Sequence, residues 1–180
     1  MTAWEVRAIL DGRKTQFRRI FKFRETNNPP ACPDKFDPKA VTQPCPFGQP
    51  GDRLWVRETF IREPAEYDLA LSSRPYREAS TVYRADVDRD EGLAKWSPSI
   101  HMPRKLSRIM LEVVSTRVER LQDVSDFGAC CEGVGRLDGP FCKSYRDGFY
   151  EIWQSIHGKK SWGENPWVRV VEFRRLEGAQ

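Results

Sequence analysis

The apolar positions between Thr2 and Asp11 form one face of a helix. Thr2 precedes them at the N-cap position, and Gly12 follows them, where glycine commonly ends a helix. The pattern therefore predicts a short helix that ends directly before the sequence GRKT.

Two later segments also have helical patterns. Ser125 can cap a helix that has Asp126 in its first turn, runs to Glu132 and ends at Gly133. Between residues 143 and 157, apolar side chains recur at intervals of three and four and predict an amphipathic helix: Tyr145, Phe149, Ile152, Trp153 and Ile156. We interpret this stripe as part of the core rather than as a platform for a ligand.

Strands are predicted where apolar and polar residues alternate or β-branched residues gather, namely in Arg53–Phe60, Ser80–Ala85, Arg108–Glu119 and Pro166–Leu176. The proline-rich residues 26–51 predict a long irregular loop, and residues 98–107 predict a loop or a single helical turn. Together these elements predict one α+β domain over residues 1–180, with a small barrel-like sheet and peripheral helices.

The composition narrows the class of protein. The chain has 180 residues, of which 39% are hydrophobic, enough for one folded domain, and its net charge is only +4. It contains no apolar run of membrane-spanning length and no charged-then-apolar leader. We therefore expect a cytoplasmic protein without a membrane partner.

The five cysteines lack CxxC spacing, which indicates free thiols in a reducing compartment: Cys32, Cys45, Cys130, Cys131 and Cys142. A zinc site made by Cys32, Cys45 and Cys142 with His101 or His157 is the less favoured alternative, because zinc ligands usually come in closely spaced pairs. We predict no metal and no cofactor.

The segment from Gly12 to Arg24, GRKTQFRRIFKFR, carries six cations, three phenylalanines and no acid. Alternating cationic and aromatic side chains favour the binding of a polyanion such as a nucleic acid, since cations bind phosphates and rings stack on unpaired bases. Two alternatives remain open: a solvated charged face, or a strand whose phenylalanines enter the core while its cations point outward. Repulsion from the neighbouring arginines favours a neutral Lys14 amine, which could serve as nucleophile or base beside a carboxylate.

Four sequence blocks occur in a characteristic order and cover well over half of the chain: VRAILDGRKTQFRR, CPFGQPGDRLWVRETF, SIHMPRKLSRIMLEVVSTRVERLQDVSDFGACCEGV and NPWVRVVEF. The chain thereby resembles ASCH-domain proteins of the PUA-like superfamily, specifically the longer type encoded by phages and prophages. The resemblance implies a small PUA-like β-barrel whose helices close a cleft, with residues 61–106 as an extended insertion. It also implies RNA or modified nucleosides as ligands, and the cytoplasm of a bacterial host as the location.

The resemblance further implies the residues of the site. Lys14 matches the catalytic lysine of the GRKT motif, and Glu132, in the sequence CEG, matches the catalytic acid. One branch of the family removes the acetyl group of acetylcytidine, and other members are ribonucleases. Lys14, or a water near it, would then attack the amide carbonyl while Glu132 relays a proton to the leaving amine. Contacts to the ligand or nucleic acid are expected from Arg13, Thr15, Phe17, Arg18 and Arg19.

Two features depart from this family pattern. Phe17 stands where the amidohydrolase branch has a second threonine, and a phenyl ring cannot make the hydrogen bond of a hydroxyl. The chain also begins almost in its first helix, whereas related phage proteins have a strand before it. We therefore expect an open sheet edge that another segment or a partner covers.

The sequence predicts binding of RNA or of a nucleotide-like ligand in a basic cleft between GRKTQFRR and the Glu132 helix. Hydrolysis of a modified nucleoside amide is the candidate activity. Ribonuclease-type phosphodiester cleavage is one alternative. An accessory protein that binds a host protein through residues 61–106 is another.

Overall fold

The computed structural model describes residues 1–21, 44–62, 81–87, 95–135 and 144–176. Most of the predicted loop at residues 26–51 lies outside these ranges, as do parts of the middle region 61–106 and two of the cysteines, Cys32 and Cys142.

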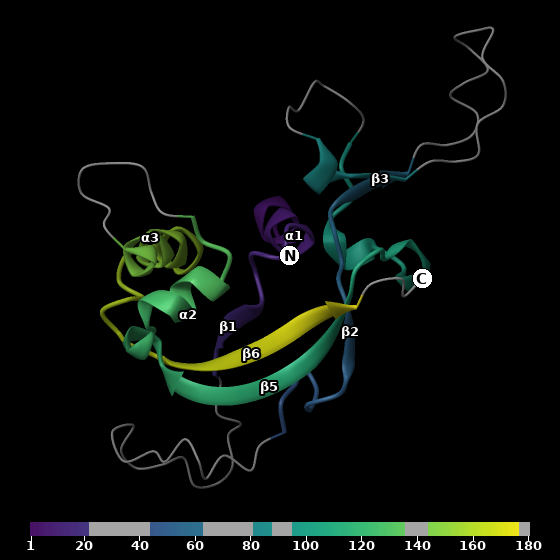
Figure 1. Ribbon diagram of the computed structural model, residues 1–180. Coiled ribbons are helices and arrows are strands. Elements are labelled where there is room, and N and C mark those ends of the chain that lie inside the picture. Colours follow the sequence, from purple (N-terminus) through teal and green to yellow (C-terminus); the bar gives the residue numbers. More distant parts are fainter. Residues whose placement is uncertain (22–43, 63–80, 88–94, 136–143, 177–180) are drawn as a thin grey trace, which may run out of the picture.

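A curled antiparallel sheet of four strands forms the centre of the fold (Figure 1). Its strand order is β1-β6-β5-β2, so β1 has a neighbour on one side only among the described strands. The bounds are Gln16–Ile20 for β1, Arg53–Trp55 for β2, Met110–Arg120 for β5 and Trp167–Leu176 for β6. The register of β5 on β6 shifts between Val113 and Ser115, and such an irregularity bends a strand. The sheet is a half-barrel within an α+β fold.

The described residues include three α-helices, and each begins and ends where its capping residues predict. Helix α1 spans Ala3–Leu10 behind Thr2, α2 spans Asp126–Cys131 behind Ser125, and α3 spans Tyr145–His157 behind Ser144. Gly12 and Gly133, at the ends of α1 and α2, have positive φ angles, as helix-ending glycines commonly do. The predicted helices are therefore confirmed.

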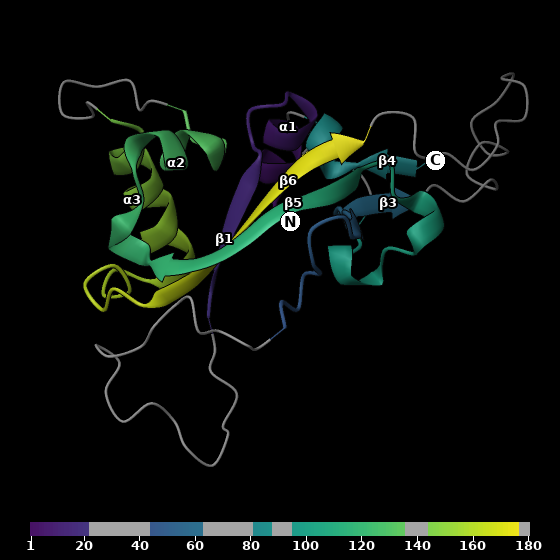
Figure 2. The ribbon, with the colours of Figure 1, turned by 60° about the horizontal axis from the view of Figure 1, so that its bottom comes forward.

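The helices cover the concave side and one end of the sheet. Helix α1 lies within the curl, and α2 and α3 lie side by side at the end where β5 finishes (Figures 1 and 2). One apolar cluster joins α1 to the sheet and includes Val6, Ile9, Leu111 and Phe173. A second cluster joins α3 to β6 and includes Phe149, Trp153, Val168 and Val170. The aromatic stripe of α3 therefore contributes to the core, as predicted.

The predicted strand Arg53–Phe60 is divided. Strand β2 ends at Trp55, and a separate strand, β3 (Phe60–Arg62), pairs with β4 (Thr81–Tyr83) in a second sheet. The chain leaves the first sheet because Glu58 turns inward, where its buried carboxylate forms an ion pair with Arg108 at 2.9 Å. Residues 98–107 contain two short 3-10 turns, in line with the predicted loop or helical turn.

Candidate functional site

The GRKT sequence lies against the end of α2. Lys14 and Glu132 form an isolated antiparallel β-bridge, and the Thr15 amide donates to the Cys131 carbonyl at 2.9 Å. Gly133 permits this close approach: its φ is +82°, and an added Cβ would lie only 2.8 Å from the Cβ atoms of Ala8 and Lys14. Two segments that lie far apart in the sequence are thus joined at backbone level.

The Glu132 carboxylate lies between two cations. Its Oε2 is 2.9 Å from Lys14 Nζ, and its Oε1 is 2.9 Å from Arg18 Nη1. Lys14 Nζ also donates to the Glu132 carbonyl at 3.0 Å, and Arg18 Nη2 forms an ion pair with Glu119 at 2.8 Å. The side chains of Lys14, Arg18 and Glu132 are 2%, 1% and 5% exposed, so this network is buried. Its charges are therefore poorly screened by water and strongly coupled.

Glu5 extends the network from α1. Its Oε1 lies 3.8 Å from Lys14 Nζ and 3.8 Å from Arg19 Nη2. Burial raises the pKa of the Glu5 carboxyl, but hydrogen bonds from Thr2 and the positive charges of Lys14 and Arg19 outweigh burial and hold the pKa below its ordinary value. Glu5 is therefore ionised at neutral pH.

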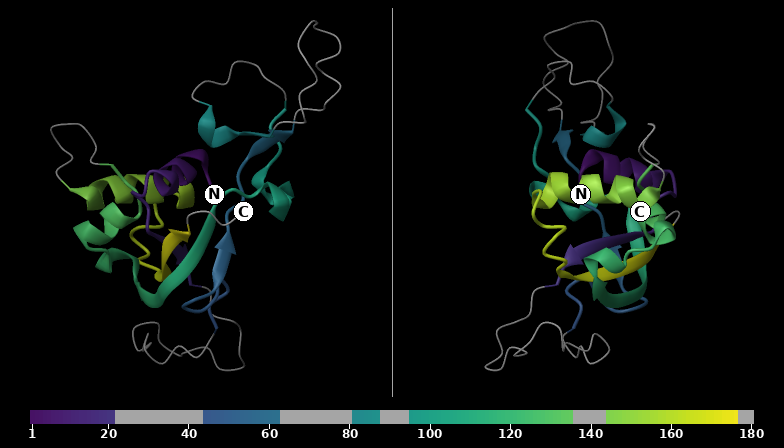
Figure 3. Two further views of the ribbon diagram at one scale, coloured as in Figure 1. Left: turned by 45° about the vertical axis from the view of Figure 1, so that its right-hand side comes forward. Right: turned by 90° about the vertical axis from the view of Figure 1, so that its left-hand side faces the viewer.

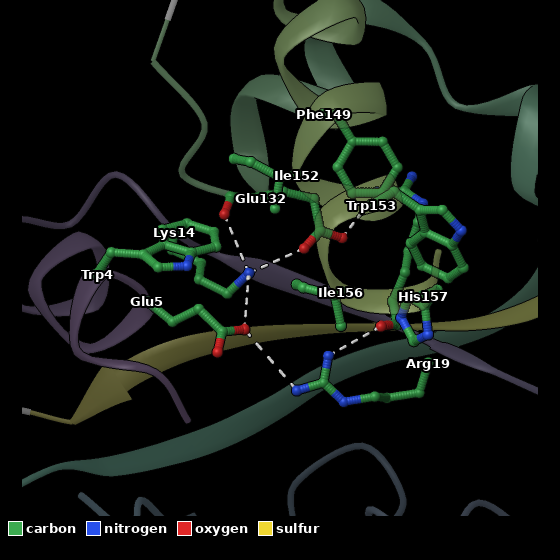
Figure 4. A pocket seen from close by; sticks show the side chains of 11 residues that line it. Trp4, Glu5, Lys14, Arg19, Glu132, Phe149, Ile152, Trp153, Ile156 and His157 are labelled. Atoms are coloured by element: carbon green, nitrogen blue, oxygen red, sulfur yellow. Dashed lines mark hydrogen bonds and ion pairs between the residues drawn. The ribbon is translucent and has the colours of Figure 1, made fainter. Parts of the chain in front are cut away.

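Helices α1 and α3 lie on the same side of the sheet (Figure 3). A pocket open to solvent lies over these charges and is lined by residues of both helices (Figure 4). Its empty space, the open part included, is about 350 Å³. Trp4 and Glu5 come from α1, and Phe149, Ile152, Trp153, Ile156 and His157 come from α3. The rings of Trp153 and His157 are 4.2 Å apart between centroids. The pocket thus has rings along its walls and charged groups at its base.

The charged groups at the pocket are paired with one another. Three cations, Lys14, Arg18 and Arg19, line the pocket together with the carboxylates of Glu5 and Glu132. Glu119 does not line it but pairs with Arg18. Lys14 is thus surrounded by carboxylates rather than by the repelling arginines that its sequence neighbours suggested. Among the cations of that segment that the structure describes, Lys14, Arg18 and Arg19 are paired with carboxylates of other segments.

His157 stands at the rim, at the end of α3. Burial, together with the positive charge of Arg19, lowers the pKa of its imidazole below the ordinary value. The imidazole is therefore neutral at neutral pH and can donate or accept a hydrogen bond.

The structure brings together four of the seven site residues that the sequence suggested. Lys14, Arg18, Arg19 and Glu132 line the pocket, and Arg19 has a side chain that is 43% exposed. Thr15 is exposed and does not line it. Arg13 also lies outside the pocket, 53% exposed, and pairs with Asp11 at 2.8 Å.

Phe17 lies in the core rather than in the pocket. Its ring packs against Phe47 and Phe173, at centroid distances of 5.1 Å and 5.9 Å. Phe21 is buried as well, in accordance with the strand alternative in which phenylalanines enter the core. That alternative has the cations pointing outward, but Arg18 is buried.

Sequence reasoning did not include Trp4, Glu5 or His157 in the site, although all three line the pocket. One signal for Glu5 was present: it stands three residues after Thr2, the spacing of a capping box. That signal explains a helix end, however, and gives no reason for a carboxylate in a pocket.

Within the described ranges, no cluster of three or more histidine, cysteine or acidic side chains has the arrangement of a metal site. Cys45, Cys130 and Cys131 are free thiols there. The same part of the chain contains no helix long and apolar enough to cross a membrane.

The chain matches no protein-family model, and neither a curated protein nor a solved structure shows significant similarity to it. The function must therefore be argued from the pocket itself.

Proposed function

We propose that this pocket binds the base of a nucleoside, either free or within single-stranded RNA. The observation that carries the proposal is the number of hydrogen bonds that the Lys14 ammonium makes. An ammonium has three N–H donors, and within the described residues its hydrogen bonds, to the carbonyl and the carboxylate of Glu132, use two. Glu5 Oε1, at 3.8 Å, is beyond hydrogen-bond distance. The remaining donor is available for an acceptor on a ligand, such as a base carbonyl or ring nitrogen.

The walls of the pocket suit a flat ligand. Trp4 from α1 and His157 from α3, neither of them buried, border the charges (Figure 4). Trp153 is buried and packs beside the His157 ring, with centroids 4.2 Å apart. Aromatic side chains bind bases by stacking, which contributes about 1–3 kcal/mol for each base. Because Lys14 and Arg18 are already paired with the Glu132 carboxylate, a neutral group fits beside them better than a phosphate. Arg19, half-exposed at the side, is the residue we assign to a phosphate or ribose.

Amide hydrolysis is a second candidate, favoured by the 2.9 Å contact between Lys14 Nζ and Glu132 Oε2. Transfer of a proton across this contact would give a neutral amine and a carboxylic acid. The amine would remove a proton from water as the water attacks an amide carbonyl. The acid would protonate the leaving nitrogen, so that the C–N bond breaks and a carboxylic acid and an amine are released.

Two arginine variants test the binding proposal. Arg19→Ala removes a cation that lines the pocket, and Arg13→Ala removes an exposed cation of the same segment that does not. Binding of the four common nucleosides, their monophosphates and short labelled RNAs would be measured by calorimetry and fluorescence anisotropy. We expect Arg19→Ala to weaken binding of monophosphates or RNA by about tenfold or more, since hydrogen bonds to charged groups contribute about 1.5–3 kcal/mol. Arg13→Ala should change it little.

Equal losses in both variants would indicate attraction to general positive charge and would contradict binding in the pocket. Salt dependence offers a second criterion, because the slope of log affinity against log salt reports the number of phosphates neutralised. A pocket with Arg19 as its phosphate contact predicts a shallow slope. Incubation with N-acylated nucleosides, followed by mass analysis, tests the hydrolytic candidate separately.

A further inference from the structure

Glu5 has one carboxylate oxygen that accepts no hydrogen bond from the described residues and faces the pocket. Its Oε2 accepts hydrogen bonds from the amide and the hydroxyl of Thr2, both at 2.9 Å. Its Oε1 has cations at 3.8 Å, Lys14 Nζ and Arg19 Nη2, too far for a hydrogen bond. The side chain is only 7% exposed. Oε1 is not one of the fully buried polar atoms without a partner, so it reaches the solvent of the pocket, where a donor of a ligand can replace water.

The carboxylate is also fixed in its orientation. Both bonds from Thr2 converge on Oε2 at the first turn of α1, and a rotation of the carboxylate would weaken both. Glu5 and Lys14 line the pocket together, and Figure 4 shows Oε1 directed toward Lys14 Nζ and Arg19. A cap of the helix explains the position of Oε2 but not why Oε1 faces the pocket.

We infer that Glu5 is a residue of ligand specificity: Oε1 accepts an N–H from the bound base while Lys14 Nζ donates to the neighbouring acceptor. The pocket would then select a base edge that presents an N–H beside a carbonyl oxygen or ring nitrogen. Carboxylates read exocyclic amino groups of bases in the same way elsewhere. This inference deepens the proposed function and rests on it.

The substitution Glu5→Gln reverses the polarity of this position. A glutamine side chain has one acceptor oxygen, and the two donors of Thr2 require that oxygen where Oε2 now lies. The amide NH₂ must then face the pocket, where it donates instead of accepting. Glutamine also supports a capping box, so α1 should persist. The variant therefore changes recognition without removing the helix cap.

The experiment measures affinity for adenosine, cytidine and uridine, each beside a derivative in which methyl groups replace every N–H of the base. We expect the wild-type protein to prefer at least one parent nucleoside by about tenfold or more over its derivative, as a hydrogen bond to a charged group implies. Glu5→Gln should remove most of that preference. Because the bulk of the methyl groups affects both proteins, the comparison isolates the hydrogen bond.

Two further variants complete the test. Glu151→Gln makes the same chemical change at an exposed position of α3 and should retain the wild-type preference. Glu5→Asp keeps the charge but withdraws the carboxylate by one methylene, and should lose the preference even if Glu5→Gln does not fold. An unchanged preference in Glu5→Gln or in a folded Glu5→Asp would overturn the role of Glu5 and leave the proposed function standing. No binding of any parent nucleoside by the wild-type protein would overturn both.

Discussion

Replacing Gly133 by alanine tests the contact on which the pocket depends. An added Cβ would lie 2.8 Å from Ala8 Cβ, 2.8 Å from Lys14 Cβ and 3.3 Å from Lys14 Cα. These atoms belong to the backbone of two other segments or are bonded directly to it, so they cannot move away by a change of rotamer as the end of a long side chain can. The substitution should push the end of α2 away from GRKT, and with it the Glu132 carboxylate away from Lys14.

The expected loss of stability has two parts. A residue with a Cβ at this positive φ costs roughly 1–2 kcal/mol, and overpacking of a close contact costs roughly 1–3 kcal/mol. Together they amount to about 2–5 kcal/mol, a large part of the roughly 5–15 kcal/mol that stabilises a typical domain. Gly12 provides the matched control. Its φ is +72°, and a Cβ there would have nothing within 4 Å. Gly12→Ala should therefore show only the cost of placing a residue with a Cβ at a positive φ.

Urea unfolding followed by circular dichroism gives both free energies of unfolding, provided that the slope m is the same for the two variants. Nucleoside binding, measured on the folded variants, should fall for Gly133→Ala and remain for Gly12→Ala. If Gly133→Ala destabilises the protein no more than Gly12→Ala does, the close approach of α2 to Lys14 is refuted. The geometry of the pocket would then have to be abandoned as well.

Two other predictions concern the charges of the site. Lys14→Met leaves Glu132 without one of its two cations and should lower the free energy of unfolding by about 3–5 kcal/mol. The double variant Lys14→Met, Glu132→Gln should recover part of this loss. If urea unfolding shows that the two substitutions have strictly additive effects, the coupling of Lys14 and Glu132 is contradicted. His157 has a pKa below its ordinary value of 6.5, so the unfolded chain binds its proton more readily. Its contribution to stability is thus complete above about pH 6.5 and is lost as the pH falls through the lowered pKa of the folded state. We would measure the free energy of unfolding of the wild type and of His157→Gln with urea from neutral pH down to about pH 5. The difference between the two free energies should change in this pH range, and a constant difference would contradict the lowered pKa of His157.

The features that the sequence predicted best are those that depend on residues close together in the chain. The ends of α1 and α2 depend on a capping side chain and a glycine within a few residues, so Thr2 with Gly12 and Ser125 with Gly133 marked them correctly. The strands β5 and β6 were recognisable because both are long and rich in β-branched residues.

The parts that sequence reasoning missed depend on distant partners. Glu58 divides the predicted strand because it meets Arg108, 50 residues later. Two cations of the run, Lys14 and Arg18, are buried and neutralised by Glu132, which is 118 and 114 residues away. No spacing rule selects one carboxylate among 26 acids. Only the fold determines which charges meet.

The buried charges themselves favour a binding role over a structural one. Glu132 ends α2, where a negative charge is unfavourable beside the helix carbonyls, and Lys14 and Arg18 compensate for it. Such a network adds little to stability, since desolvation offsets the attraction and apolar residues of similar size often serve as well. Lys14 and Glu5 each keep a hydrogen-bonding position toward the pocket, a donor on Nζ and an acceptor at Oε1. A donor and an acceptor side by side are what the recognition of a base edge requires.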